Sequence, residues 1–279
     1  MRGVSTRGGE PYISGAAMSD LFRGTTALIT GASRGIGAAF ADLLAQRGAN
    51  LVLVARHADT LNPIAERARG RGVRVTVLPA DLTRPEAPDE IADATVREGL
   101  TIDHLINNAG LGGAGRFQDV PIAEQLPTIE VNVRSLTALA GRFLPGMLQR
   151  SRGGLLNVAS TSAFQGLQWL PVYSASKAYV VTLSEAIWVG LRGTGVRCCC
   201  LSPGPVDTPY FDNNQIDRPP KWAMQSAEAV ARAGLRGYER NDCHVLPFLP
   251  FRLLAWSTRL APRALAARLG GWYAAPRNR

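Results

Sequence analysis

The chain has 279 residues, a formal net charge of +9 and 19% charged residues. This length allows one large domain with a substantial core, and the composition is that of a globular protein rather than a disordered one. No apolar stretch is long enough for a transmembrane helix or a signal peptide, so we expect a cytoplasmic protein. We divide the chain into a flexible extension at 1–20, a main folded domain at 21–247 and a basic, apolar-rich helical tail at 248–279.

Short runs rich in Val, Ile and Leu alternate with helix-length segments along the main domain. Strands are predicted at 25–30, 50–55, 73–78, 103–108, 153–160, 195–201 and 243–248. Such runs suit strands that are covered on both faces, as in a parallel sheet wrapped by helices. Helices are predicted between them at 36–46, 58–71, 86–97, 124–149, 173–192 and 227–240. The pattern predicts a doubly wound α/β fold with seven parallel strands in the order 3-2-1-4-5-6-7.

The first predicted strand leads into the segment TGASRGIG, from Thr30 to Gly37. Its glycines allow a tight turn and a close approach of the backbone to a phosphate, and the following helix offers its amino terminus to the anion. A simple turn would also use glycines, but the strand before and the helix after favour a dinucleotide pyrophosphate site. The expected contacts are Gly31, Ser33, Arg34, Gly35, Ile36 and Gly37.

The second predicted strand ends in Val54, Ala55 and Arg56, with no acidic residue to bind the adenosine ribose hydroxyls. Arg34 in the glycine loop supplies a second guanidinium close to Arg56. Two guanidiniums without a competing carboxylate fit a phosphate on the ribose, so we predict NADP(H) rather than NAD(H). The alternative is that both are surface arginines without a binding role.

A second chemical motif is YSASK, in which Tyr173 and Lys177 are four residues apart and project from one helical face. A phenol is a poor acid at neutral pH, and a neighbouring ammonium stabilises the phenolate. Ser160 ends the preceding predicted strand, where open α/β sheets bind their ligands. The three residues together predict a site that protonates a substrate oxygen.

Over residues 21–247 the chain resembles the classical short-chain dehydrogenase/reductase family, which implies a Rossmann-type catalytic domain. The resemblance rests on the glycine loop, on YSASK, and on Asp81-Leu82, Asn107–Gly110, Asn132-Val133, Ser160 and Pro203-Gly204 in the family's order. The sequences of these segments are most similar to the DltE-like branch, which is related to hydroxysteroid and ketoacyl reductases.

The resemblance implies roles for individual residues. Tyr173 would be the general acid, Ser160 would bind the substrate oxygen, and Lys177 would hold the nicotinamide ribose and tune Tyr173. Asn132 would anchor a water that relays protons to Lys177, and Asp81 would accept from the adenine amino group. Further cofactor contacts would be Leu82, Asn108, Ala109, Gly110, Pro203, Gly204, Val206 and Thr208. For Asn132 and Thr208, a polar helix residue and a loop cap are the alternative explanations.

Three segments are expected to frame the substrate, at 111–117, 164–172 and 209–224. They are rich in large apolar residues, which predicts reduction of a hydrophobic ketone to a secondary alcohol. Besides Ser160 and Tyr173, the expected substrate contacts are Phe164, Trp169, Tyr210 and Phe211, in a rim that also contains Phe117, Leu167, Leu170, Trp222 and Met224. Oxidation of the alcohol, epimerisation, dehydration and a non-catalytic NADP-binding regulator remain alternatives.

Four cysteines and a basic tail complete the sequence. Cys198, Cys199 and Cys200 are expected in a buried strand, while Cys243 and His244 supply too few ligands for a metal site.

Residues 251–279 contain six arginines and no acid, but no nucleic-acid-binding module surrounds them. The family suggests a homodimer or homotetramer. We favour packing of the tail on a second subunit, or over the substrate, rather than peripheral membrane contact, because its apolar positions form no single stripe.

Overall fold

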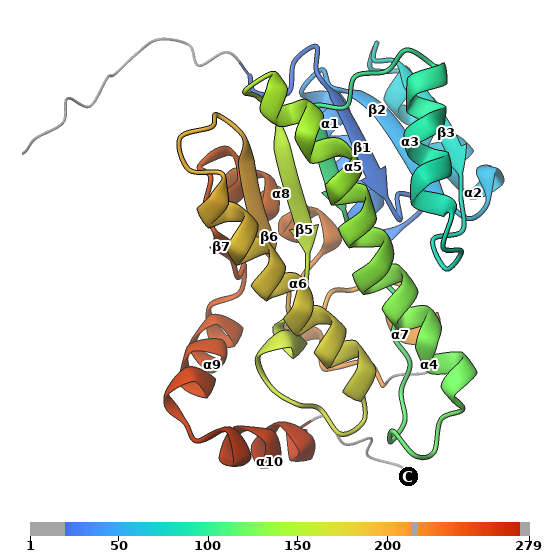
Figure 1. Cartoon of the computed structure of the whole chain (residues 1–279). Coiled ribbons are helices and arrows are strands. Elements are labelled where there is room, and N and C mark those ends of the chain that lie inside the picture. The colour runs from blue at the N-terminus through green and yellow to red at the C-terminus, as the bar shows by residue number, and fades with distance from the viewer. Residues whose placement is uncertain (1–19, 214–216, 274–279) are drawn as a thin grey trace, which may run out of the picture.

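The computed structural model describes residues 20–213 and 217–273, and in this part of the chain one parallel sheet organises the fold (Figure 1). Its seven strands have the order β3-β2-β1-β4-β5-β6-β7, which confirms the predicted topology. The strands are β1 Thr26–Thr30, β2 Asn50–Ala55, β3 Val75–Pro79, β4 His104–Asn107, β5 Gly154–Val158, β6 Arg197–Leu201 and β7 His244–Val245.

Helices cover both faces of this sheet. The α-helices are α1 Gly35–Gln46, α2 Ala58–Arg69, α3 Ala87–Arg97, α4 Ile122–Ile129, α5 Leu136–Gln149, α6 Pro171–Gly190, α7 Tyr210–Asn213, α8 Ala227–Glu239, α9 Leu249–Leu260 and α10 Arg263–Tyr273. Two 3-10 turns, η2 Thr161–Phe164 and η3 Lys221–Ala223, lie in the long connections. Because successive strand residues point to opposite faces, Ile29 of β1 packs with α1, α2 and α8, whereas Leu28 packs with α3 and α5.

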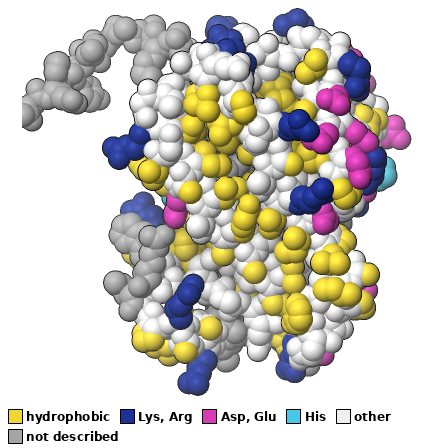
Figure 2. Space-filling model, in the orientation of Figure 1, with side chains coloured by type: hydrophobic (Ala, Val, Ile, Leu, Met, Phe, Trp, Pro, Cys, Tyr) yellow, Lys and Arg dark blue, Asp and Glu magenta, His cyan; other side chains and the backbone are white. Residues whose placement is uncertain are grey.

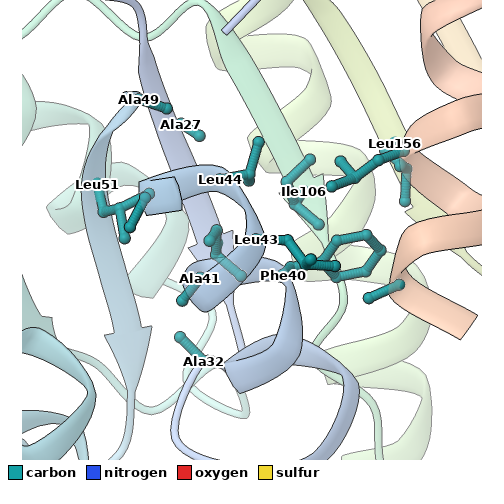
Figure 3. Packing of buried hydrophobic residues seen from close by; sticks show 14 of the residues in the cluster. Ala27, Ala32, Phe40, Ala41, Leu43, Leu44, Ala49, Leu51, Ile106 and Leu156 are labelled. Carbon is teal, nitrogen blue, oxygen red and sulfur yellow. The ribbon is translucent and has the colours of Figure 1, made fainter. Parts of the chain in front are cut away.

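The core beneath α1 explains how tightly that helix is held. Figure 3 shows Phe40 of α1 pointing toward Ile106 of β4 and Leu156 of β5. Helix α8 approaches closely here because Gly234 has no side chain: a Cβ atom at Gly234 would lie 2.8 Å from Leu201 Cδ2 and 3.3 Å from Phe40 Cζ. The helix that follows the glycine loop therefore has a fixed position against the sheet.

Two elements differ from the sequence prediction. The single helix expected at 124–149 is α4 and α5 joined by a π-helical segment, η1, at Glu130–Ser135. The strand expected at 243–248 pairs only over His244–Val245. Pro247 cannot donate a ladder hydrogen bond, and the chain turns there into α9, so the edge strand stays short.

Buried polar groups join strands and helices at two places in the core. Asn107 Nδ2 donates to Asn157 Oδ1 at 3.0 Å, and Asn157 Nδ2 donates to Ser184 Oγ at 3.0 Å, which ties β4, β5 and α6 together. At the other end of the sheet, His104 Nδ1 lies 2.7 Å from Tyr238 Oη, and both rings pack against Phe22. All three rings are almost completely buried.

Candidate active site

One long cleft of about 1430 Å³ runs along the carboxyl ends of the strands. The predicted site residues that line it are Gly31, Ser33, Arg34, Gly35, Ile36, Arg56, Asp81, Leu82, Asn108, Ala109, Gly110, Ser160, Phe164, Trp169, Tyr173, Lys177, Pro203, Gly204, Val206, Thr208, Tyr210 and Phe211. The predicted residues that do not line it are Gly37 and Asn132. Residues far apart in the sequence therefore meet in one cavity, as open α/β sheets require.

The glycine loop forms an anion-binding end of this cleft. Gly31 and Gly35 have φ angles of +65° and +56°, a backbone region that favours glycine. Gly37 is buried, and a Cβ atom there would lie 2.2 Å from the carbonyl oxygen of Gly31, so this position requires glycine for space. Helix α1 has no side-chain cap and no acidic residue in its first turn. Its free amides fit the pyrophosphate of a dinucleotide.

Residues after β4 hold this loop in place. Asn108 Nδ2 donates to the carbonyl oxygens of Thr30 at 2.9 Å and Gly31 at 3.2 Å. Thr30 Oγ1 accepts from the backbone N–H groups of Asn108 and Ala109, both at 3.0 Å. On the opposite side, the methyl group of Thr208 lies 3.0 Å from the position of a Cβ atom at Gly35. The anion-binding end of the cleft is therefore formed by residues at or after the ends of three strands, β1, β4 and β6.

Arg34 and Arg56 are exposed and line the same end of the cleft. Among the residues that the structure describes, no carboxylate forms an ion pair with either guanidinium. Asp81, after β3, lines the cleft as well, and its Oδ1 accepts from the backbone and hydroxyl of Thr83 at 3.0 and 2.9 Å. The two arginines are thus available to an anionic ligand.

Ser160, Tyr173 and Lys177 meet at the other end of the cleft. Helix α6 begins at Pro171, which places Tyr173 in its first turn and Lys177 one turn later. Lys177 is 3% exposed, its Nζ donates to Val158 O at 2.8 Å, and it lies 5.8 Å from the ring centroid of Tyr173. Burial lowers the pKa of Lys177 to about 8, so the ammonium form still dominates at pH 7.

Tyr173 is the central group of this cluster. Burial raises the pKa of its phenol, and hydrogen bonds with Ser160 and Tyr210 lower it in part. Ser160 caps the η2 turn, and its Oγ accepts from Ser162 N at 3.2 Å. Serine, tyrosine and lysine side chains therefore lie together at this end of the cleft.

Asn132 is buried and is not among the residues that line the cleft. It is fully buried in η1, where its Nδ2 donates to Leu111 O at 2.8 Å and Ser176 Oγ at 2.9 Å, and its Oδ1 accepts from Leu111 N at 2.9 Å. These bonds tie the π-helical segment to the loop after β4 and to α6. The water that Asn132 was expected to anchor stays a prediction.

The apolar end of the cleft includes residues that sequence reasoning missed. Phe251, Leu254 and Ala255 of α9 line it together with Phe164, Trp169, Phe211 and Trp222. A Cβ atom at Gly204 would lie 2.6 Å from Phe251 Cδ2, so α9 packs directly on the loop after β6. Phe117 and Met224 do not line the cleft. The alternation of arginine and apolar residues in the tail was the available sequence signal, and it did not specify this contact.

The outer surface of the tail is basic and apolar. Figure 1 places α9 and α10 at the end of the molecule toward which the strand arrows point. Figure 2 shows hydrophobic side chains and arginines together over these helices, and Leu249, Leu253 and Leu265 are 59%, 57% and 49% exposed. Among the described helices, none has the length and apolar character to cross a bilayer. Contact with a second subunit or with a membrane surface stays a prediction.

The strand of cysteines has a core role. Cys198, Cys199 and Cys200 of β6 are fully buried and contribute to different clusters of the core. Burial raises the pKa of each thiol, that of Cys200 to about 12. Within the described ranges, no group of three or more His, Cys, Asp or Glu side chains could hold a metal ion.

Fold and site together define a dinucleotide-binding α/β oxidoreductase with a tyrosine and lysine pair at the reacting end. A family model described as short chain dehydrogenase matches residues 25–219, and the chain belongs to this family. An uncharacterized oxidoreductase of Myxococcus xanthus is 36% identical over 236 residues, which cover 85% of this chain and 91% of that protein.

Solved structures agree with this assignment. A short-chain dehydrogenase of Sphingobium yanoikuyae in complex with NADPH is 32% identical, with a TM-score of 0.77 and coverage of 91% and 98% of the two chains. A bulky-bulky ketone specific alcohol dehydrogenase of Comamonas testosteroni is 30% identical, with a TM-score of 0.72 and coverage of 84% and 92%. A family member of Burkholderia phymatum in complex with NAD is 26% identical, with a TM-score of 0.77 and coverage of 86% and 93%. A nicotinamide dinucleotide is thus the cofactor class.

Proposed function

We propose that the protein is an NADPH-dependent reductase that converts a hydrophobic ketone to a secondary alcohol, with Tyr173 as the general acid. The observation that carries this proposal is the position of Ser160, Tyr173 and Lys177 at one end of a cleft whose other end holds an uncapped helix terminus and two arginines. The apolar residues around the reacting end would contact the substituents of the ketone.

The bound nicotinamide would supply the hydride that reduces the carbonyl carbon. Ser160 donates a hydrogen bond to the substrate oxygen, and Tyr173 transfers its phenolic proton to the same oxygen. The Lys177 ammonium, 5.8 Å from the centre of the Tyr173 ring, stabilises the resulting phenolate by its charge.

The preference for NADPH over NADH is assigned to Arg34 and Arg56. Each arginine would form a charge-assisted bond to a ribose phosphate, of the kind that contributes about 1.5–3 kcal/mol. The Sphingobium yanoikuyae relative was solved with NADPH, whereas the Burkholderia phymatum protein was solved with NAD. The cofactor must therefore be tested on this chain.

Charge reversal at Arg56 tests the cofactor preference. We expect Arg56→Asp to weaken NADPH binding at least tenfold, with a much smaller effect on NADH, in a fluorescence titration with each nucleotide. Arg97→Asp changes the net charge equally but lies on α3, outside the cleft. If the NADPH preference survives Arg56→Asp, the assignment is wrong.

Turnover is tested by NADPH consumption with aliphatic, aromatic, steroid and β-ketoacyl thioester ketones. We expect Tyr173→Phe to abolish turnover while it retains NADPH binding. Tyr179→Phe is the matched control, because Tyr179 lies on the same helix and bonds Thr137 Oγ1 at 2.9 Å on the outer surface. Turnover only with alcohols and NADP would favour the oxidation, and tight binding without turnover would favour a regulator.

A further inference from the structure

A second serine hydroxyl lies beside Ser160, the residue proposed to bind the substrate oxygen. Ser162 Oγ is 3.0 Å from Ser160 Oγ, a hydrogen-bonding distance, and Ser162 N donates to the same oxygen at 3.2 Å. Both residues line the cleft. The reaction proposed above uses Ser160 and assigns no role to Ser162.

The η2 turn holds the two serines close together. Ser160 is the N-cap of this turn, and its carbonyl oxygen accepts from Ala163 N at 3.1 Å. Between the serines, Thr161 N donates to Pro203 O at 2.9 Å, which ties the turn to the loop after β6. The backbone that carries both hydroxyls is therefore anchored by hydrogen bonds within the turn and to a neighbouring loop.

The direction of the hydrogen bond between the two hydroxyls follows from what each group can donate. A hydroxyl has one proton to donate and two lone pairs that accept, whereas a ketone oxygen only accepts. Ser160 must therefore use its proton on the substrate oxygen when a ketone is bound. Its contact with Ser162 Oγ at 3.0 Å then requires Ser162 as the donor.

We propose that Ser162 is a positioning residue whose hydroxyl and backbone N–H both donate to Ser160 Oγ and so direct the Ser160 proton toward the substrate oxygen. The inference rests on the proposed function, in which Ser160 binds that oxygen. Both serines keep their protons during the reaction, because Tyr173 supplies the proton that the substrate gains.

The chain of hydrogen bonds from Ser162 through Ser160 to the substrate acts mainly in the transition state. Negative charge grows on the substrate oxygen as the hydride reaches the carbonyl carbon, and hydrogen bonds in a chain polarise and strengthen one another. An interaction that is stronger in the transition state than in the bound ketone raises the rate rather than the affinity. Loss of the Ser162 hydroxyl should therefore slow the chemical step and leave ketone binding nearly unchanged.

A single-turnover measurement tests this role. Enzyme with NADPH is mixed rapidly with an active ketone, or enzyme with NADP with an active alcohol, so that product release does not limit the rate. We expect Ser162→Ala to lower the maximal rate about tenfold, with the half-saturating substrate concentration within about twofold of the wild type. Ser162→Thr keeps a hydroxyl at a position that is only partly buried, and it should restore the rate to within about threefold.

A matched control removes a serine hydroxyl elsewhere. Ser226 Oγ accepts from Ala229 N at 3.2 Å at the start of α8, outside the cleft, so Ser226→Ala should leave the single-turnover rate unchanged. NADPH should raise the Tm of Ser162→Ala as much as that of the wild type, which shows that the variant folds and binds the cofactor.

A double substitution separates an effect through Ser160 from a general effect on the turn. Once Ser160 is alanine, Ser162→Ala should change the rate by less than about twofold. Equal losses in both backgrounds, a wild-type rate in Ser162→Ala, or a change in the half-saturating concentration alone would overturn the role of Ser162 and leave the proposed function standing. Absence of wild-type turnover in both directions would refute the proposed function, and the role of Ser162 with it.

Discussion

Acid is expected to destabilise this fold through His104. Its imidazole is 1% exposed, between Tyr238 and Phe22, and burial lowers its pKa from 6.5 to about 4, although Asp103 opposes this in part. Between these two pH values the His104 imidazole is protonated in the unfolded chain and neutral in the folded protein. The stability provided by neutral His104 is therefore complete above pH 6.5 and is lost as the pH falls toward 4.

The size of this effect follows from the difference of about 2.5 units between the His104 pKa values in the unfolded and folded states. At 1.36 kcal/mol per unit, keeping His104 neutral contributes about 3 kcal/mol to the free energy of unfolding at neutral pH, and about 2 kcal/mol of this contribution is lost at pH 5. Urea unfolding at pH 7 and pH 5 measures the loss. His104→Gln should be less stable than the wild type at pH 7, with a difference that shrinks by about 2 kcal/mol at pH 5.

A control elsewhere in the core separates titration from packing. Phe40→Leu removes part of a fully buried ring on α1 and changes no titrating group. It should lower the free energy of unfolding by about 1–3 kcal/mol, equally at both pH values. If the stability difference between wild type and His104→Gln is the same at pH 7 and pH 5, the reasoning is wrong.

Three further substitutions test contacts described above. Gly37→Ala places a methyl group 2.2 Å from the Gly31 carbonyl oxygen, so NADPH should no longer raise the Tm in a thermal shift assay. Gly204→Ala pushes on the ring of Phe251, and steady-state kinetics should show a several-fold higher KM for a bulky ketone. Asn157→Ala leaves the buried Asn107 Nδ2 without its acceptor and removes the donor to Ser184 Oγ, which should cost about 1–3 kcal/mol in urea unfolding.

The topology and the glycine loop could be predicted because their signals are local. A buried parallel strand is a run of apolar residues, and a glycine loop is recognised by the strand and helix on either side of it. The π-helical segment at Asn132 could not be predicted in this way, because no local sequence pattern marks it and its side-chain bonds join residues that are distant in the sequence, Leu111 and Ser176.

The apolar half of the site depends on contacts between distant parts of the chain. Phe251 reaches the cleft because Gly204 leaves room for its ring, and Tyr210 meets Tyr173 because Gly112 leaves room for its hydroxyl. Neither glycine belongs to a sequence pattern that predicts which side chain packs against it. The sequence identified residues of the reacting end and several side chains of the wall around it, such as Phe164, Trp169 and Phe211, but not those that α9 contributes.

The contact between α9 and the cleft makes the tail and the ligand thermodynamically linked. Phe251, Leu254 and Ala255 form part of the wall, so a ligand that touches them gains binding free energy from a docked tail. Linkage is reciprocal, and the same ligand must hold the tail in place by the same amount. The affinity of this protein for a ligand that touches these residues therefore also reports how stably α9 packs on the cleft.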